Sequence, residues 1–192
     1  MKKVLLALLI PTLAFAGDPK DAKKAPAAQP AAPPAQPAPP PEVKATVDAF
    51  KGTWTYDSTI TATGMPGMEK PVKFKMTMAC KSIAGGNAVG CDGKAKTPMG
   101  PWEGSFMIGY DPYSKAVHFI GVTNEFEVHD HVCQWKGTAD LACTPLKAGM
   151  GPGGDEITED LSMHFEKNTM NFNSVTHGKG GTTMTFEGKG KK

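Results

Sequence analysis

The four cysteines of this chain are spaced so that each of two pairs has a turn sequence at its midpoint. The pairs and their midpoints are Cys80 and Cys91 around Gly85-Gly86, and Cys133 and Cys143 around residues 137–139. Cysteines equally distant from a turn face each other across two antiparallel strands, where a disulfide closes without moving the backbone. Of the three connectivities that four cysteines allow, this local one is predicted. It implies a β architecture and an oxidising compartment, and it leaves no thiol as a ligand or nucleophile.

The N-terminal residues 1–16 are typical of a secretory signal peptide. A lysine pair at residues 2–3 precedes an apolar run at residues 4–10, and the small-residue sequence at 14–16 is a cleavage site. The apolar run is too short to span a bilayer, so no stable membrane insertion is expected. We therefore expect cleavage near Ala16 and a periplasmic or secreted bacterial protein, in a compartment where disulfides form.

Residues 17–42 are rich in Ala, Pro, Gln and Lys and contain no aromatic residue. Such a segment cannot bury enough apolar surface to offset the entropy of ordering, so a disordered linker is predicted. It serves either as a passive spacer or as a tether that holds the following domain away from a surface. Residues 43–192 are expected to form one domain, because a chain of this length buries a sizeable core without a metal.

Every basic residue of the chain is a lysine, and the formal net charge is only +2. Arginine is the usual residue for recognising phosphates and base edges, because its planar fork donates two parallel hydrogen bonds. A nucleic-acid partner is therefore not expected. The sequence does not determine the oligomeric state, and a monomer is assumed.

After one predicted helix at residues 43–51, apolar and polar residues alternate with a period of two, which is typical of strands. The residues expected on inward faces include Phe74, Met76, Met78, Phe106, Ile108, Tyr110, Leu161, Met163, Phe165, Met170, Phe172, Met184 and Phe186. Short turns separate these runs, so the fold class is all-β with about nine or ten antiparallel strands. That many strands close into a barrel or form two packed sheets, and we expect a single up-and-down barrel.

Two short motifs resemble known β-barrel families. Residues 52–54 (Gly-Thr-Trp), which follow the predicted helix, resemble the lipocalin and wider calycin signature, in which the tryptophan plugs one end of the barrel. Residues 102–111 resemble a bacterial family of calycin-like barrels called domain of unknown function 1579. The resemblance covers most of residues 50–188 and implies a calycin-like fold with an internal ligand cavity, but no defined activity. One departure is that the arginine which packs on the tryptophan in lipocalins has no candidate here.

The residues with the strongest metal-binding character lie in one predicted strand. One face would carry Glu127, His129, His131, Cys133 and Trp135, and the other Phe126, Val128, Asp130 and Val132. Two imidazoles two residues apart suit zinc or copper, and Glu127 could add an oxygen ligand. In the alternative arrangement the valine face is the core and both histidines are solvated. The valines favour this alternative, whereas Asp130 counts against it because it would need a buried partner.

Methionine provides the other metal-binding candidates, because thioethers bind copper(I). Met76 and Met78 share a strand face with Phe74 and are interpreted as core fillers. Met65 and Met68 flank a Pro-Gly turn, and they are either copper ligands or an apolar rim of the barrel. The acidic run at residues 155–160 matches no known calcium loop and is interpreted as a solvated loop.

No catalytic motif is found: the chain has no Gly-x-Ser-x-Gly elbow and no phosphate-binding loop. A non-enzymatic binding protein is expected, with a small apolar ligand inside the barrel. The residues expected to line the ligand site are Trp54, Phe74, Met76, Met78, Phe106, Tyr110, Met163, Phe165, Phe172 and Met184. The alternatives are an envelope structural or interaction domain on a proline-rich tether, and a periplasmic copper- or zinc-binding protein that uses His129 and His131. No other cofactor is expected.

Overall fold

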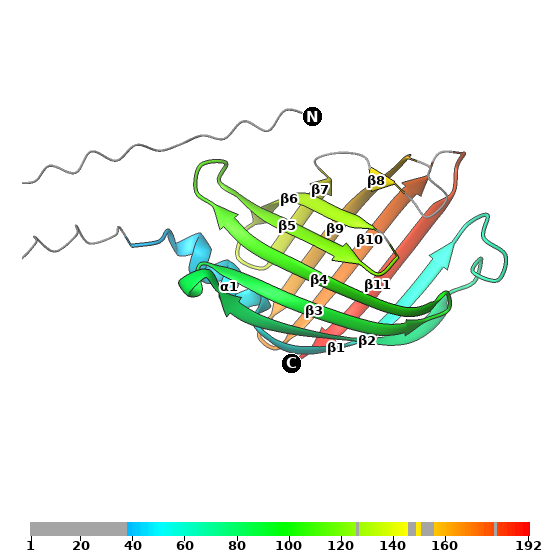
Figure 1. Cartoon of the computed structure of the whole chain (residues 1–192), viewed down its shortest axis with the longest axis horizontal. Coiled ribbons are helices and arrows are strands. Elements are labelled where there is room, and N and C mark those ends of the chain that lie inside the picture. Colours follow the sequence, from blue (N-terminus) through cyan, green and yellow to red (C-terminus); the bar gives the residue numbers. More distant parts are fainter. Residues whose placement is uncertain (1–37, 126, 146–148, 151–155, 179) are drawn as a thin grey trace, which may run out of the picture. The chain divides into compact units, whose positions relative to one another are not determined.

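The computed structural model describes residues 38–125, 127–145, 149–150, 156–178 and 180–192. The predicted signal peptide and residues 17–37 of the predicted linker lie outside the described residues. The elements are α1 (Pro41–Phe50), β1 (Gly52–Ala62), β2 (Val72–Ile83), a 3₁₀ turn (Ala84–Gly86), β3 (Ala88–Thr97), β4 (Gly100–Asp111), β5 (Ala116–Thr123), β6 (Val128–Lys136), β7 (Asp140–Pro145), β8 (Gly149–Met150), β9 (Glu156–Glu166), β10 (Thr169–Gly178) and β11 (Thr183–Lys191) (Figure 1).

The strands form one antiparallel sheet that closes on itself. Consecutive strands from β1 to β7 pair with each other, β7 pairs with β9, and β9, β10 and β11 continue the sheet to β1. Strand β8 has two residues and pairs with β9 beside this ring. The fold is therefore the predicted all-β up-and-down barrel, with ten strands and one short helix, and not a sandwich of two sheets.

Both predicted disulfides are present and join directly opposed residues of neighbouring strands. Cys80 faces Cys91 across β2 and β3, and Cys133 faces Cys143 across β6 and β7. Their Cα atoms are 4.0 Å and 3.9 Å apart. All four side chains are buried, so each bond lies on the inner face of the barrel and fixes which neighbours of the cysteines point inward.

Helix α1 packs against one end of the barrel (Figure 1). It begins at Pro41, where the fixed φ of proline suits the first turn, rather than at Val43 as expected. Val43, Val47 and Phe50 are buried on one face of the helix, as the sequence predicted. A hydrogen bond from Trp135 Nε1 to Thr46 Oγ1 (3.2 Å) ties the helix to β6. The helix therefore closes this end of the interior.

Trp54 is the second part of this closure. Its side chain is buried at the start of β1, and its Nε1 donates a hydrogen bond to the carbonyl of Phe50 (2.7 Å). The Nζ of Lys192 lies 4.5 Å from the centre of the Trp54 ring. The same ammonium group donates to the carbonyls of Asp48 and Ala49 near the end of α1. A lysine from the C-terminus thus provides the cation over the tryptophan that no arginine of this chain can supply.

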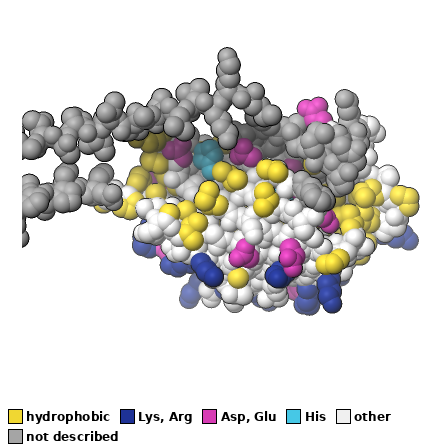
Figure 2. Space-filling model, in the orientation of Figure 1, with side chains coloured by type: hydrophobic (Ala, Val, Ile, Leu, Met, Phe, Trp, Pro, Cys, Tyr) yellow, Lys and Arg dark blue, Asp and Glu magenta, His cyan; other side chains and the backbone are white. Residues whose placement is uncertain are grey.

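The outer surface carries charged side chains of both signs, as Figure 2 shows for one face of the molecule. Lys75 pairs with Asp57, and Lys94 lies 3.3 Å from Glu103, with all four side chains well exposed. Such exposed pairs contribute little to stability. Among the described residues, no helix is long and apolar enough to cross a membrane.

Replacing both Cys133 and Cys143 with alanine is expected to lower the free energy of unfolding by about 3 kcal/mol, because a short closed loop restricts the unfolded chain. Urea titrations of this variant and of the oxidised wild type measure the difference. A reductant that opens both bonds should destabilise the wild type by more than the double substitution does. A wild-type midpoint that does not move with reductant would contradict the disulfides.

Candidate functional site

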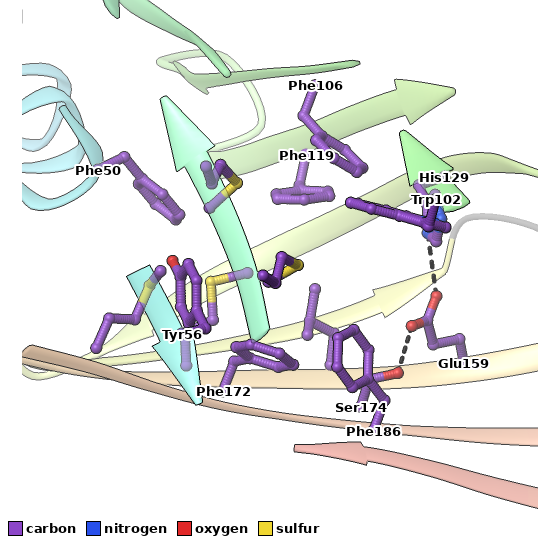
Figure 3. A pocket seen from close by; sticks show the side chains of 15 residues that line it. Phe50, Tyr56, Trp102, Phe106, Phe119, His129, Glu159, Phe172, Ser174 and Phe186 are labelled. Atoms are coloured by element: carbon purple, nitrogen blue, oxygen red, sulfur yellow. Dashed lines mark hydrogen bonds and ion pairs between the residues drawn. The ribbon is translucent and has the colours of Figure 1, made fainter. Parts of the chain in front are cut away.

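The barrel interior contains a cavity of about 110 Å³ (Figure 3). Its walls are mostly aromatic and aliphatic side chains, and a histidine, a glutamate and a serine are among them. The lining residues are Phe50, Tyr56, Met76, Met78, Trp102, Phe106, Phe119, His129, Glu159, Leu161, Met163, Met170, Phe172, Ser174 and Phe186. An apolar enclosure with a few polar groups is typical of small-molecule binding sites.

The structure divides the predicted ligand-site residues into two groups. Met76, Met78, Phe106, Met163 and Phe172 line the cavity. The other predicted residues surround the core without lining the cavity: Trp54 lies under α1, Tyr110 and Phe165 pack against the buried core, Phe74 stacks on Phe186, and Met184 is partly buried on β11. The period-two pattern therefore identified inward faces, but not the depth of each side chain along the barrel.

Several lining residues were not predicted, among them Tyr56 and Phe119. Tyr56 follows Trp54 by two residues on β1, so it shares the inward face of that strand. Its ring occupies space left by Gly190, where an added Cβ would lie 2.4 Å from a ring atom of Tyr56. The signal that could have located Tyr56 is therefore the pairing of an inward aromatic residue with a glycine on the neighbouring strand.

The hydroxyl group of Tyr56 is buried and has no hydrogen-bond partner among the described residues. Burial raises the pKa of Tyr56 well above its ordinary value, so the group is a neutral donor at physiological pH. An unpaired buried hydroxyl costs about 1–3 kcal/mol. Tyr56 is also one of the residues that line the cavity.

The interior face of β6 is the histidine face, which corrects the arrangement that the valines favoured. His131 is only 2% exposed and Val128 is 68% exposed. The reason is strand parity: Cys133 is buried in its disulfide, so His131, two residues earlier, must also point inward. Valine is usually buried, but the register of the closed sheet places Val128 on the outer face. Phe126, which was assigned to the valine face, lies outside the described residues.

The two histidines meet Glu159 from β9. Glu159 Oε2 lies 3.2 Å from Nδ1 of His129 and 3.3 Å from Nε2 of His131. One ligand atom from each of the three side chains fits within 4.8 Å of the others. The interpretation of residues 155–160 as a solvated loop is therefore wrong for Glu159, whose side chain is 18% exposed on an inward strand face. The signal that could have shown this is spacing: Glu159 lies two and four residues before Leu161 and Met163, so it shares their inward face of the strand.

Two further side chains hold this cluster in place. The hydroxyl of Ser174 on β10 donates a hydrogen bond to Glu159 Oε1 (Figure 3). Glu127, the oxygen ligand predicted from sequence, instead places its Oε2 3.5 Å from Nε2 of His129. Glu127 thus contacts Nε2 of His129, while Glu159 contacts Nδ1.

The pKa values of His129 and Glu159 follow from their burial and their partners. Burial alone would lower the pKa of His129, but hydrogen bonds and charges from Glu127 and Glu159 outweigh it and raise the pKa to about 9. Burial alone would raise the pKa of Glu159, but His129, His131 and Ser174 hold it well below its ordinary value. At neutral pH the site is therefore an ion pair of a protonated His129 and an ionised Glu159.

The methionines proposed for copper lie elsewhere in the chain. Met65 and Met68 belong to the turn between β1 and β2, where Met68 N donates to the carbonyl of Met65 (3.0 Å). The side chain of Met68 is buried. Neither methionine is among the residues that line the cavity with His129 and Glu159.

A ten-stranded antiparallel barrel closed by a short helix and hollow inside is a calycin-like barrel. The chain belongs to the family of proteins of unknown function DUF1579, whose model matches residues 39–191. The resemblance seen in residues 102–111 is thereby confirmed over the whole barrel. A comparison with curated proteins found no match.

Replacing His129 with glutamine should flatten the pH dependence of stability measured with a chelator present. Because the pKa of His129 is higher in the folded protein than in the unfolded chain, its protonation stabilises the folded state. This stabilisation is full below pH 6.5 and is lost as the pH rises toward about 9. The lowered pKa of Glu159 gives stabilisation that is lost as the pH falls below 4.5. The wild type should therefore lose about 3 kcal/mol relative to the variant between pH 6 and pH 9.

The matched control for this experiment is His177→Gln, because His177 is exposed on β10. Its unfolding free energy, measured by urea titration at each pH, should follow that of the wild type. Parallel curves for the wild type and His129→Gln would contradict the ion pair.

Proposed function

We propose that this protein is an exported, non-enzymatic binding protein that holds a small apolar ligand inside its barrel. The observation that carries the proposal is the internal cavity, whose walls are formed by aromatic rings and thioethers. Apolar atoms that line a cavity lack contacts on one side, and an apolar molecule restores those contacts. The signal peptide predicted from the sequence and the two disulfides support export.

The volume of the cavity limits the size of the ligand. An engineered apolar cavity of about 150 Å³ in another protein binds benzene. At about 110 Å³, this cavity fits one small ring or a short branched chain. Met76, Met78, Met163 and Met170 line it, and flexible thioethers let such a wall adapt to ligands of different shape.

Filling the cavity from its own wall should abolish binding of a small ring. Leu161 lines the cavity, and its neighbour Ser162 is exposed on the same strand. Leu161→Phe should weaken toluene binding at least about tenfold, whereas the control Ser162→Phe should bind like the wild type. Trp102 also lines the cavity, so its fluorescence reports binding, and calorimetry measures the affinity. Absence of saturable binding to the wild type would favour the alternative of an interaction domain.

The unpaired hydroxyl of Tyr56 should select ligands that carry a hydrogen-bond acceptor. Cyclohexanone and methylcyclohexane have similar shapes, and only the ketone accepts a hydrogen bond. Tyr56→Phe should weaken cyclohexanone binding about fivefold, which corresponds to one neutral hydrogen bond, and leave methylcyclohexane binding unchanged. Equal losses for both probes would show that the substitution acts through packing rather than through the hydroxyl.

A further inference from the structure

We propose that His129, His131 and Glu159 bind a divalent metal ion of the zinc type at the inner wall of the barrel. The inference goes beyond the proposed function, because a metal at these residues requires no apolar ligand. It also changes the ligand set expected from the sequence: Glu159 replaces Glu127 as the oxygen donor.

The distances within the cluster suit a tetrahedral ion. Zinc lies about 2.0–2.2 Å from imidazole nitrogen and carboxylate oxygen, so ligand atoms at neighbouring corners are about 3.3 Å apart. Glu159 Oε2 is 3.2 Å from His129 Nδ1 and 3.3 Å from His131 Nε2. Two edges of the coordination polyhedron are therefore already close to the required length, and the whole set lies within 4.8 Å.

His131 gives an independent reason to place an ion here. Its side chain is 98% buried, and neither ring nitrogen makes a hydrogen bond within the described part of the chain. Its Nε2 lies near Glu159 but outside hydrogen-bonding geometry. Leaving a polar group unpaired in the interior is costly. A cation between His131 and Glu159 would provide the partner that Nε2 lacks.

The contacts around the cluster orient the donor atoms toward a common point. The hydrogen bond from Ser174 occupies Oε1 of Glu159 and leaves Oε2 for the ion. Glu127 lies at Nε2 of His129 and leaves Nδ1 for the ion. A carboxylate on the far nitrogen of a ligating histidine is a common outer contact of zinc sites, because it fixes the tautomer and the ring orientation.

The donor set also indicates the kind of site. Two imidazoles and one carboxylate suit zinc, and three protein ligands leave one tetrahedral position open. His129 and Glu159 both line the cavity (Figure 3), so we place the open position on the cavity side. A molecule in the cavity that carries a nitrogen or sulfur donor would complete the coordination.

The test is a titration of the metal-stripped full chain with Zn²⁺ by calorimetry, and with Co²⁺ by absorption. The wild type should bind one ion, and Co²⁺ should show the intense visible bands of a tetrahedral complex. Glu159→Gln keeps the size of the side chain and should weaken Zn²⁺ binding at least about a hundredfold. Glu127→Gln should weaken it about tenfold, as expected for an outer contact. Imidazole should shift the Co²⁺ bands by entering the open position.

The matched controls are His164→Gln and His177→Gln, because neither side chain belongs to the cluster. Both should bind Zn²⁺ like the wild type. Wild-type affinity in Glu159→Gln, or loss of binding in either control, would overturn the proposal. Circular dichroism in chelator checks that every variant is folded. Toluene binding in chelator separates the two proposals, since it tests the apolar cavity without metal.

Discussion

Pairing of β1 with both β2 and β11 is the constraint on which the rest of this structure depends. It closes the sheet, so every barrel strand has two partners and one committed inner face. Once the sheet is closed, a shift by one residue would exchange the inner and outer side chains of a whole strand. The buried disulfides on β2–β3 and β6–β7 hold this register at two places. The cavity walls, the histidine cluster and the charged outer surface all follow from this alternation of inward and outward side chains along the strands.

The two ends of the barrel interior differ. Helix α1 covers one end, and no other α-helix is present among the described elements to cover the opposite end. Trp54, capped by the ammonium of Lys192, fills the end under α1. His129 and His131 lie in the first half of β6, and the antiparallel order places that half away from α1. The polar cluster therefore lies toward the end of the barrel that α1 does not cover.

Alternation and cysteine spacing were sufficient to predict the antiparallel strands, the turns and both disulfides, because these depend on local pattern. They left a closed barrel and two packed sheets both open, since closure rests on the long-range pairing of β1 with β11. The inner face of β6 was not predictable in this way, since both faces of residues 127–133 contain core-compatible residues. Only the long-range register, in which Cys133 is buried, decides between them. The role of Glu159 was missed for the same reason: its partners lie on another strand, 28 and 30 positions earlier in the sequence (159 − 131 and 159 − 129).

The interior polar groups are unfavourable for stability alone. A buried ion pair is rarely more stable than well-packed apolar residues of similar volume, and an unpaired hydroxyl or imidazole is worse. Yet the barrel keeps His129, His131 and Glu159 inside, and Tyr56 points an unpaired hydroxyl into the same interior. Departures from the best core packing are expected where a protein binds something. A barrel that served only as a rigid spacer could fill this volume with leucine and valine, so packing alone does not account for the polar groups on which the two proposals rest.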